Sequence, residues 1–228
     1  MLDINIKKQT VNIEEGQYVG TPVMIIDLGK QFQTDWQTGD IQTWDDGNPK
    51  IQNEVFISFA LLTEEMVMED GTTANPRVGK TFTVSTNEKA AIVGLLRASG
   101  VKSTNLLELV NTAVNIDVGK TATGNPKVRN FAKPNAKVVY KDNIVSVAEL
   151  IKNASIKVTV FDIDNPDEDV LNSLPDFLKN KINDQASREK YREKMNPAKA
   201  STAKPVMTEE EVEDVLDKAI PYWYDVRR

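Results

Sequence analysis

The chain lacks the two side chains on which most protein catalysis depends. Its 228 residues contain no His and no Cys, which excludes an imidazole base, a thiolate nucleophile, and zinc or iron–sulfur sites built on these ligands. Catalysis would have to use carboxylates, Lys, Tyr, Ser or Thr, together with a hard metal ion such as magnesium. We therefore expect a binding protein that is not an enzyme, with no cofactor and no metal.

A run of carboxylates in the last third of the chain is the alternative to that expectation. It consists of Asp162, Asp164, Asp167, Glu168 and Asp169. Counted from Asp162, the positions at which a calcium-binding loop needs Gly and its terminal Glu hold Asp167 and Ser173. The spacing favours a solvated turn that leads into a helix, whose N-terminus carboxylates stabilise. A carboxylate–metal enzyme stays open as a third hypothesis, although the sequence supplies no nucleophile.

Charge is distributed unevenly along the chain, whose formal net charge is −6. Residues 1–76 carry 4 basic and 13 acidic side chains, residues 77–157 carry 13 and 5, and residues 158–228 carry 11 and 16. The densest basic part is 118–141, which contains no Asp or Glu. Because charges more than about 8–10 Å apart are largely screened at physiological salt, this segment can attract a polyanion locally. The alternative is that its lysines form the solvated face of strands.

Residues 127–133 combine cations with an aromatic ring in one strand register. In an extended strand, one side would carry Lys127, Arg129, Phe131 and Lys133. Single-strand binding needs cations that follow the phosphates and flat rings on which bases stack, each worth about 1–3 kcal/mol. The pattern predicts a nucleic-acid surface with little sequence preference. The alternative buries Phe131 and leaves the cations fanning out at a sheet edge.

Further candidates for this surface lie outside that run. They are Trp36, Trp44, Phe56, Arg77, Lys80 and Lys120. The two tryptophans lie in a polar loop between the first two expected strands, where they either stack on bases or pin the loop to the domain. Phe56 stands on the otherwise polar face of the second strand, with packing against the terminal helix as the alternative. Arg77 and Lys80 begin the third strand and would extend the basic surface.

The elements expected to position these residues are mainly strands, predicted from alternating apolar and polar residues between turn residues. They span 17–28, 50–62, 78–85, 114–121, 127–132 and 136–147. Pro22 indicates an edge or a bulge in the first strand, and the second is expected to pack on one side only. Helices are predicted at 89–98 and 103–113. The order β-β-β-α-β-β is that of a five-stranded OB-fold barrel with a helix between its third and fourth strands, whose open face and loops bind oligonucleotides or oligosaccharides.

The C-terminal part is expected to add a strand at 156–161, a helix at 173–194 and a linker at 196–206. An acidic, partly apolar tail follows. Its candidate partner-binding residues are Glu209, Glu210, Glu211, Glu213, Asp214, Asp217, Tyr222 and Trp223. Such a tail can occupy the protein's own basic groove or dock on a partner's basic patch. The alternative is a solubilising amphipathic helix packed on the domain.

Four blocks of sequence follow one another in a recognisable order. They are GQYVGTPVMIIDLGKQF at 16–32, EVFISFALL at 54–62, KTFTVSTNEKAAIVGLLRAS at 80–99 and SLPDFLKNKI at 173–182. In this order the chain resembles the single-stranded DNA-binding proteins of tailed bacteriophages, a family of OB-fold replication proteins. The resemblance implies a non-catalytic protein that coats single-stranded DNA during phage replication and contacts replication or recombination enzymes through an acidic tail.

The leading hypothesis is accordingly a protein that coats and protects single-stranded DNA and meets phage or host proteins through its tail. The second is a phage structural or protein-interaction β-barrel domain without nucleic-acid binding. The start, MLDINIKKQT, lacks the apolar run of a signal peptide, and no stretch approaches the roughly 20 apolar residues that span a bilayer. We expect no membrane partner and a location in the cytoplasm of a bacterial host. The sequence divides into an OB-fold single-stranded DNA-binding domain at 1–162, a helical extension at 163–195, and a linker with the acidic tail at 196–228.

Overall fold

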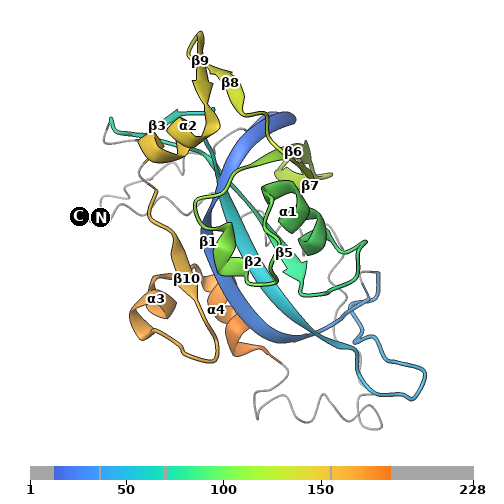
Figure 1. Cartoon of the computed structure of the whole chain (residues 1–228). Coiled ribbons are helices and arrows are strands. Elements are labelled where there is room, and N and C mark those ends of the chain that lie inside the picture. Colours follow the sequence, from blue (N-terminus) through green and yellow to red (C-terminus); the bar gives the residue numbers. More distant parts are fainter. Residues whose placement is uncertain (1–12, 36, 69–70, 155, 186–228) are drawn as a thin grey trace.

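The computed structural model describes residues 13–35, 37–68, 71–154 and 156–185 (Figure 1). Within them a six-stranded sheet has the hydrogen-bonded order β5-β2-β1-β6-β7, with β10 paired to β1. Its strands are β1 (Gly16–Phe32), β2 (Ile51–Leu61), β5 (Arg77–Thr83), β6 (Val114–Lys120), β7 (Pro126–Ala132) and β10 (Thr159–Phe161). Two short pairs are β3 (Met66–Val67) with β4 (Thr73–Ala74), and β8 (Lys137–Tyr140) with β9 (Asn143–Ser146). The helices are α1 (Ala91–Ser99), the 3-10 turn η1 (Leu106–Leu109), α2 (Val147–Ala154), α3 (Glu168–Ser173) and α4 (Asp176–Asn183).

β1 is the strand on which the sheet is assembled, and its β-branched and apolar residues keep it extended over 17 residues. Its first part, Gly16–Gly20, pairs antiparallel with β6, whereas Met24–Ile26 pairs parallel with β10. Between these parts, the register against β2 shifts after Pro22. Because proline has no N–H to donate to a ladder, it is suited to the point where β1 changes neighbours. The bulge that Pro22 indicates in the sequence is confirmed.

The sheet ends at β5 and β7, and these two edge strands approach each other without forming a ladder. Side chains fill the contact: Phe131 of β7 packs against Phe59 and Phe82, and the Lys80 ammonium on β5 donates a hydrogen bond to the carbonyl oxygen of Val128 at 3.1 Å. The prediction of a mainly β fold with helices is confirmed. In the described residues the sheet is not closed into a barrel, because side chains and not backbone pairs join its two edges.

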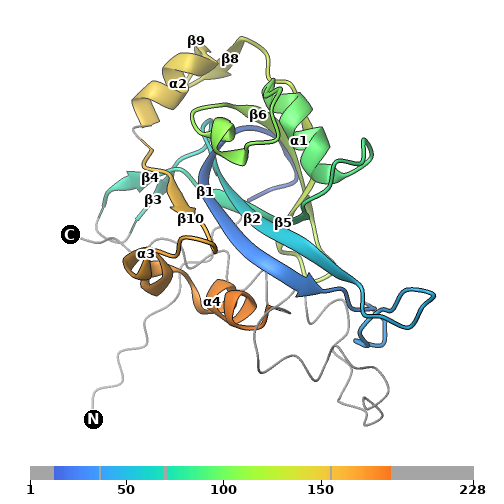
Figure 2. The same ribbon diagram turned by 60° about the horizontal axis from the view of Figure 1, so that its bottom comes forward.

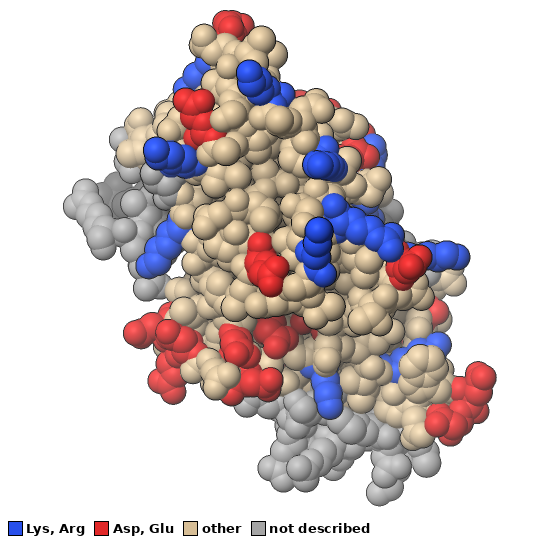
Figure 3. All heavy atoms as spheres, viewed as in Figure 1, with Lys and Arg blue, Asp and Glu red and all other residues tan. Residues whose placement is uncertain are grey.

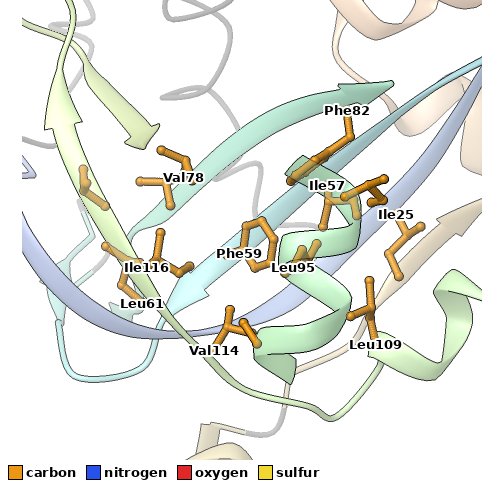
Figure 4. Packing of buried hydrophobic residues seen from close by; sticks show 14 of the residues in the cluster. Ile25, Ile57, Phe59, Leu61, Val78, Phe82, Leu95, Leu109, Val114 and Ile116 are labelled. Carbon is orange, nitrogen blue, oxygen red and sulfur yellow. The ribbon is translucent and has the colours of Figure 1, made fainter. Parts of the chain in front are cut away.

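The main hydrophobic core lies between the inner face of the sheet and α1 (Figure 4). Ile57, Phe59 and Leu61 alternate along β2 on this face, as the two-residue period of the sequence predicts. Leu95 of α1 and Leu109 of η1 pack over them and are fully buried. Each such side chain contributes about 1.5–3 kcal/mol by leaving water. This core holds β5, β6 and β7 in fixed positions, and their outer residues therefore form a defined surface.

A second hydrophobic cluster covers the opposite face of β1 and β2 (Figure 2). Phe56 of β2 packs there against Phe177 of α4, with the ring centroids 5.5 Å apart and the planes nearly perpendicular. Leu178 and Ile182 of α4 complete the contact and are buried. β2 is therefore covered on both faces, and the prediction that it packs on one side only is wrong because α4 covers the other.

The segment expected to form one strand at 136–147 is a hairpin. Its strands β8 and β9 turn at Lys141 and Asp142, which both adopt positive φ angles. α2 follows at once, and its Val147 and Leu150 pack with β1 residue Val19 in a third cluster. The hairpin thus extends from the sheet while α2 ties it to the domain.

Two predicted helices are shorter in the structure. The helix expected at 103–113 is reduced to η1, and the chain turns out of helical geometry where Asn111 adopts a φ of 62°. The helix expected at 173–194 begins after Pro175 as α4 and ends at Asn183, while Ser173 is the last residue of α3. Leu174 lies outside both helices, because a residue before proline is biased away from helical geometry. Residues beyond 185 lie outside the described part. Every described helix is too short or too polar to cross a bilayer.

Candidate nucleic-acid interface

The orientation of the β7 side chains depends on a bulge. Asp117 of β6 pairs with Asn130, but its neighbour Val118 pairs with Val128, so Arg129 is an extra residue without a cross-strand partner. A bulge of this kind reverses the alternation of side chains beyond it. Val128 and Phe131 therefore face the core, and the side shared by Lys127 and Arg129 is not the side of Phe131.

Phe131 belongs to the core and not to the outer surface. Its ring centroid lies 5.4 Å from that of Phe59 and 5.8 Å from that of Phe82, and the side chain is half-buried. The predicted register in which it stands beside three cations and stacks on a base is therefore wrong. Val128 and Phe131 both face the core although they are three residues apart, whereas a regular strand repeats every two residues. This spacing is the sequence feature that indicates the bulge.

Four cations lie on β6, on β7 and on the edge strand β5 that approaches β7, and we call them the basic track. They are Lys80, Lys120, Lys127 and Arg129. Lys127 is paired across the ladder with Gly119, next to Lys120. Gly119 has no Cβ, and the guanidinium of Arg129 occupies the space that a Cβ would take.

Lys80 is a half-buried member of the basic track. Burial, together with the nearby Lys127 ammonium, lowers the pKa of Lys80 below its ordinary value. Its Nζ atom donates to the Val128 carbonyl oxygen at 3.1 Å and lies 6.0 Å from the centroid of the Phe82 ring. An anion beside Lys80 would stabilise its charged ammonium group and so compensate for the hydration that the group loses by burial.

Two carboxylates that sequence reasoning missed are part of the same surface. Glu14 forms an ion pair with Lys120 at 3.0 Å, and Glu15 forms one with Arg129 at 2.9 Å. Both pairs are partly open to solvent, with about half of the Arg129 and Glu15 side chains exposed. The adjacent carboxylates just before the first strand could have indicated this pairing, because that strand runs antiparallel to β6.

The other predicted site residues are placed differently. Arg77 begins β5 and is half-buried, whereas Lys133 follows β7 and is exposed. Trp44 lies in the loop between β1 and β2 with 53% of its surface exposed, and the Lys50 ammonium lies 5.1 Å from its ring centroid. Phe56 is 2% exposed beneath α4. The stacking role expected for Phe56 is therefore wrong, and the packing alternative describes it.

Several predicted residues fall outside the described part of the chain. Trp36 is one of them. The tail residues are the others: Glu209, Glu210, Glu211, Glu213, Asp214, Asp217, Tyr222 and Trp223.

Acidic and basic side chains gather over different elements (Figure 3). Lys and Arg lie over the region of β6, β7 and α1, whereas Asp and Glu gather at the lower left over α3. The Asp167 carboxylate caps α3 by accepting hydrogen bonds from the backbone N–H groups of Asp169 and Val170. Asp162 accepts from the Asp164 N–H group and the Asn165 side chain. Among the described residues, no group of three or more acidic side chains is placed to hold a metal ion.

The described surface thus offers a set of cations on β5, β6 and β7, and an exposed tryptophan in a loop. Comparisons of the chain with protein-family models, with curated proteins and with solved structures found no match.

Proposed function

We propose that this protein binds single-stranded DNA along the basic track and coats and protects it during phage replication and recombination. The observation that carries the proposal is the placement of Lys80, Lys120, Lys127 and Arg129 on β6, on β7 and on the edge strand β5 that approaches β7, away from the acidic residues of α3. Cations in such a row neutralise successive phosphates, which supplies most of the affinity of non-specific binding. Contacts of this kind read no base sequence, so binding has little sequence preference.

The order of the strands supports the assignment of an OB-fold. The long strands β1, β2, β5, β6 and β7 are ordered β5-β2-β1-β6-β7, with α1 between the third and fourth of them. OB-folds are partly open barrels that bind oligonucleotides through the loop between strands 1 and 2, the loop between strands 4 and 5, and the face of strands 2 and 3. Here the first of these loops carries Trp44, and the second is flanked by Lys120 and Lys127. Both loops therefore have suitable chemistry.

The proposal includes a non-catalytic role and protein partners. The absence of His and Cys from the sequence supports binding without catalysis. The acidic tail at 209–217 would meet phage or host replication and recombination proteins, as the resemblance to phage single-stranded DNA-binding proteins implies. The place of action would then be the cytoplasm of a bacterial host.

The test is a titration of oligo-dT, and of oligo-rU in parallel, at two salt concentrations. Tryptophan fluorescence reports binding because Trp44 is exposed. For a single strand, the slope of log K against log salt is about −0.7 per phosphate neutralised. We expect a slope of about −2 to −3 if the four cations of the basic track each meet a phosphate.

A matched pair of substitutions separates the track from overall charge. Lys127→Glu and Lys152→Glu change the net charge equally, but Lys152 lies on α2 and not on the basic track. We expect Lys127→Glu to weaken oligo-dT binding about tenfold or more at low salt. The affinity of Lys152→Glu should stay close to that of the unmodified protein. Equal effects of both variants, or no oligo-dT binding at low salt, would overturn the proposal. The second outcome would favour a protein-interaction domain.

A further inference from the structure

An apolar groove of about 930 Å³ lies beside α1, between this helix, the end of β5 and the segment 100–106. None of the basic-track residues lines it. Its apolar walls are formed by Val84, Ile92, Val93, Leu96, Val101 and Leu106. Val84 is 47% exposed, and Leu107 beside the groove is 51% exposed. Contiguous exposed apolar surface of this kind marks a docking site.

The charge around the groove restricts what can occupy it. Its charged lining residues are Arg97 and Lys102, and no Asp or Glu lines it. Arg97 has a carboxylate neighbour in Glu88 at 3.9 Å, but both side chains are well exposed, so this pair is weak. An apolar groove with a basic rim fits an amphipathic helix whose apolar stripe is flanked by carboxylates.

A segment of this chain has that chemistry. Residues 208–220, TEEEVEDVLDKAI, place Val212, Val215, Leu216 and Ile220 at the spacing of one helical stripe. Its carboxylates are Glu209, Glu210, Glu211, Glu213, Asp214 and Asp217. The apolar stripe of this segment is complementary to the apolar walls of the groove, and its carboxylates are complementary in charge to the basic rim.

The chain leaves the described structure close to the groove. Gln185 lines a neighbouring cavity of about 630 Å³, whose walls also include Val84 and Leu106. These two residues line the groove as well. The 22 residues from 186 to 207 separate Gln185 from the acidic segment, and a chain of that length spans at most about 73–79 Å when fully extended. The acidic segment is therefore tethered within reach of the groove, and tethering makes its binding there an intramolecular event.

We propose that residues 208–220 dock as an amphipathic helix in the groove beside α1 of the same chain. Val215 and Leu216 then face the apolar walls, while the carboxylates lie near Arg97 and Lys102. No basic-track residue lines the groove, so this contact does not occupy the space of those cations within it. The inference does not rest on nucleic-acid binding, and its test contains no nucleic acid.

The absence of Cys from the chain makes a cross-linking test direct. In the full-length protein, Thr104→Cys at the groove and Ala219→Cys in the segment provide two thiols for a short bismaleimide. The control pairs Ala219→Cys with Thr38→Cys, because Thr38 is an equally exposed threonine in the loop between β1 and β2. We expect rapid cross-linking within one chain for the groove pair and at least about tenfold less for the control pair, read by mass spectrometry after proteolysis.

Two further variants show whether the contact has the proposed chemistry. Leu216→Asp removes an apolar anchor, and the pair Arg97→Glu with Lys102→Glu reverses the rim charge at exposed positions, where folding is maintained and can be checked by circular dichroism. Either change should abolish the preference for the groove pair. Equal cross-linking of groove and control pairs would overturn the proposal. Cross-links between two chains that increase with protein concentration would also overturn it, in favour of a second copy as the occupant.

Discussion

At the scale of single residues, Glu14 and Glu15 occupy positions at which the basic track would otherwise meet phosphate. Their carboxylates lie about 3 Å from Lys120 and Arg129. A nucleic acid that uses these two cations must displace both carboxylates. The ion pairs are partly solvated, so each contributes only about 0.2–1 kcal/mol. They therefore reduce affinity without preventing binding.

Replacing both carboxylates should strengthen binding. We expect Glu14→Gln combined with Glu15→Gln to lower the dissociation constant for oligo-dT by about 2- to 30-fold at low salt. Glu88→Gln is the control, since it frees Arg97 on α1 at a place outside the basic track. Fluorescence titration measures the three affinities. An equal gain from the control would mean that only net charge matters.

Lys80 gives the binding surface a pH dependence. Because burial and Lys127 lower the pKa of Lys80, its ammonium loses its proton at lower pH than the other lysines do. Affinity for oligo-dT should therefore begin to fall at a lower pH than that at which ordinary lysines, with a pKa of about 10.4, titrate. Lys80→Arg keeps its charge over this range, and its affinity should stay constant up to about pH 10. Oligo-dT titrations of the two proteins over this pH range measure the effect. The same pH profile for both proteins would contradict this role of Lys80.

At the scale of elements, β7 shows where sequence reasoning succeeds and where it fails. The strand itself and its basic character follow from residue types and turn residues. The direction of each side chain beyond Arg129 does not, because one inserted residue reverses the alternation. The same limit applies to Phe56, whose burial depends on α4, a helix far away in the sequence. Lys127 and Arg129 are exposed, whereas the rings of Phe56 and Phe131 pack in the hydrophobic clusters.

Truncation of Phe131 tests the reversed alternation. We expect Phe131→Ala to lower the free energy of unfolding by about 2–4 kcal/mol, because it removes contacts with Phe59 and Phe82 between the two sheet edges. The affinity of the folded fraction for oligo-dT should be unchanged. Urea denaturation and titration at low temperature separate the two quantities. Unaltered stability with a loss of affinity would place the ring on the binding surface instead.

At the scale of the whole molecule, two hydrophobic cores share the strands β1 and β2. Ile25 and Ile57 face the core beneath α1, and Ile26 and Phe56 face the cluster beneath α4. Displacement of α1 or α4 would expose one face of β1 and β2, and the other face of the same strands forms the other core. The described residues up to 185 should therefore unfold together, even though the sequence divides at about residue 162 into a barrel and an extension.

Leu178→Ala in α4 tests this coupling. The side chain is fully buried, so we expect a loss of about 2–5 kcal/mol from the free energy of unfolding. The loss should appear in one cooperative transition, followed by both circular dichroism and tryptophan fluorescence. An early separate transition in which α4 melts while the sheet stays folded would show that the two cores are independent.

The division of β1 between two neighbours also determines when the protein can complete its fold during synthesis. Met24 pairs with Thr159, and these residues are 135 positions apart in the chain. At about 5–20 residues per second, a ribosome needs about 7–27 s to make that stretch. Until then β1 presents an unpaired edge and an uncovered apolar face to solvent. The nascent chain is thus most vulnerable to aggregation before β10 and α4 emerge, and these last-made elements protect the first-made strand.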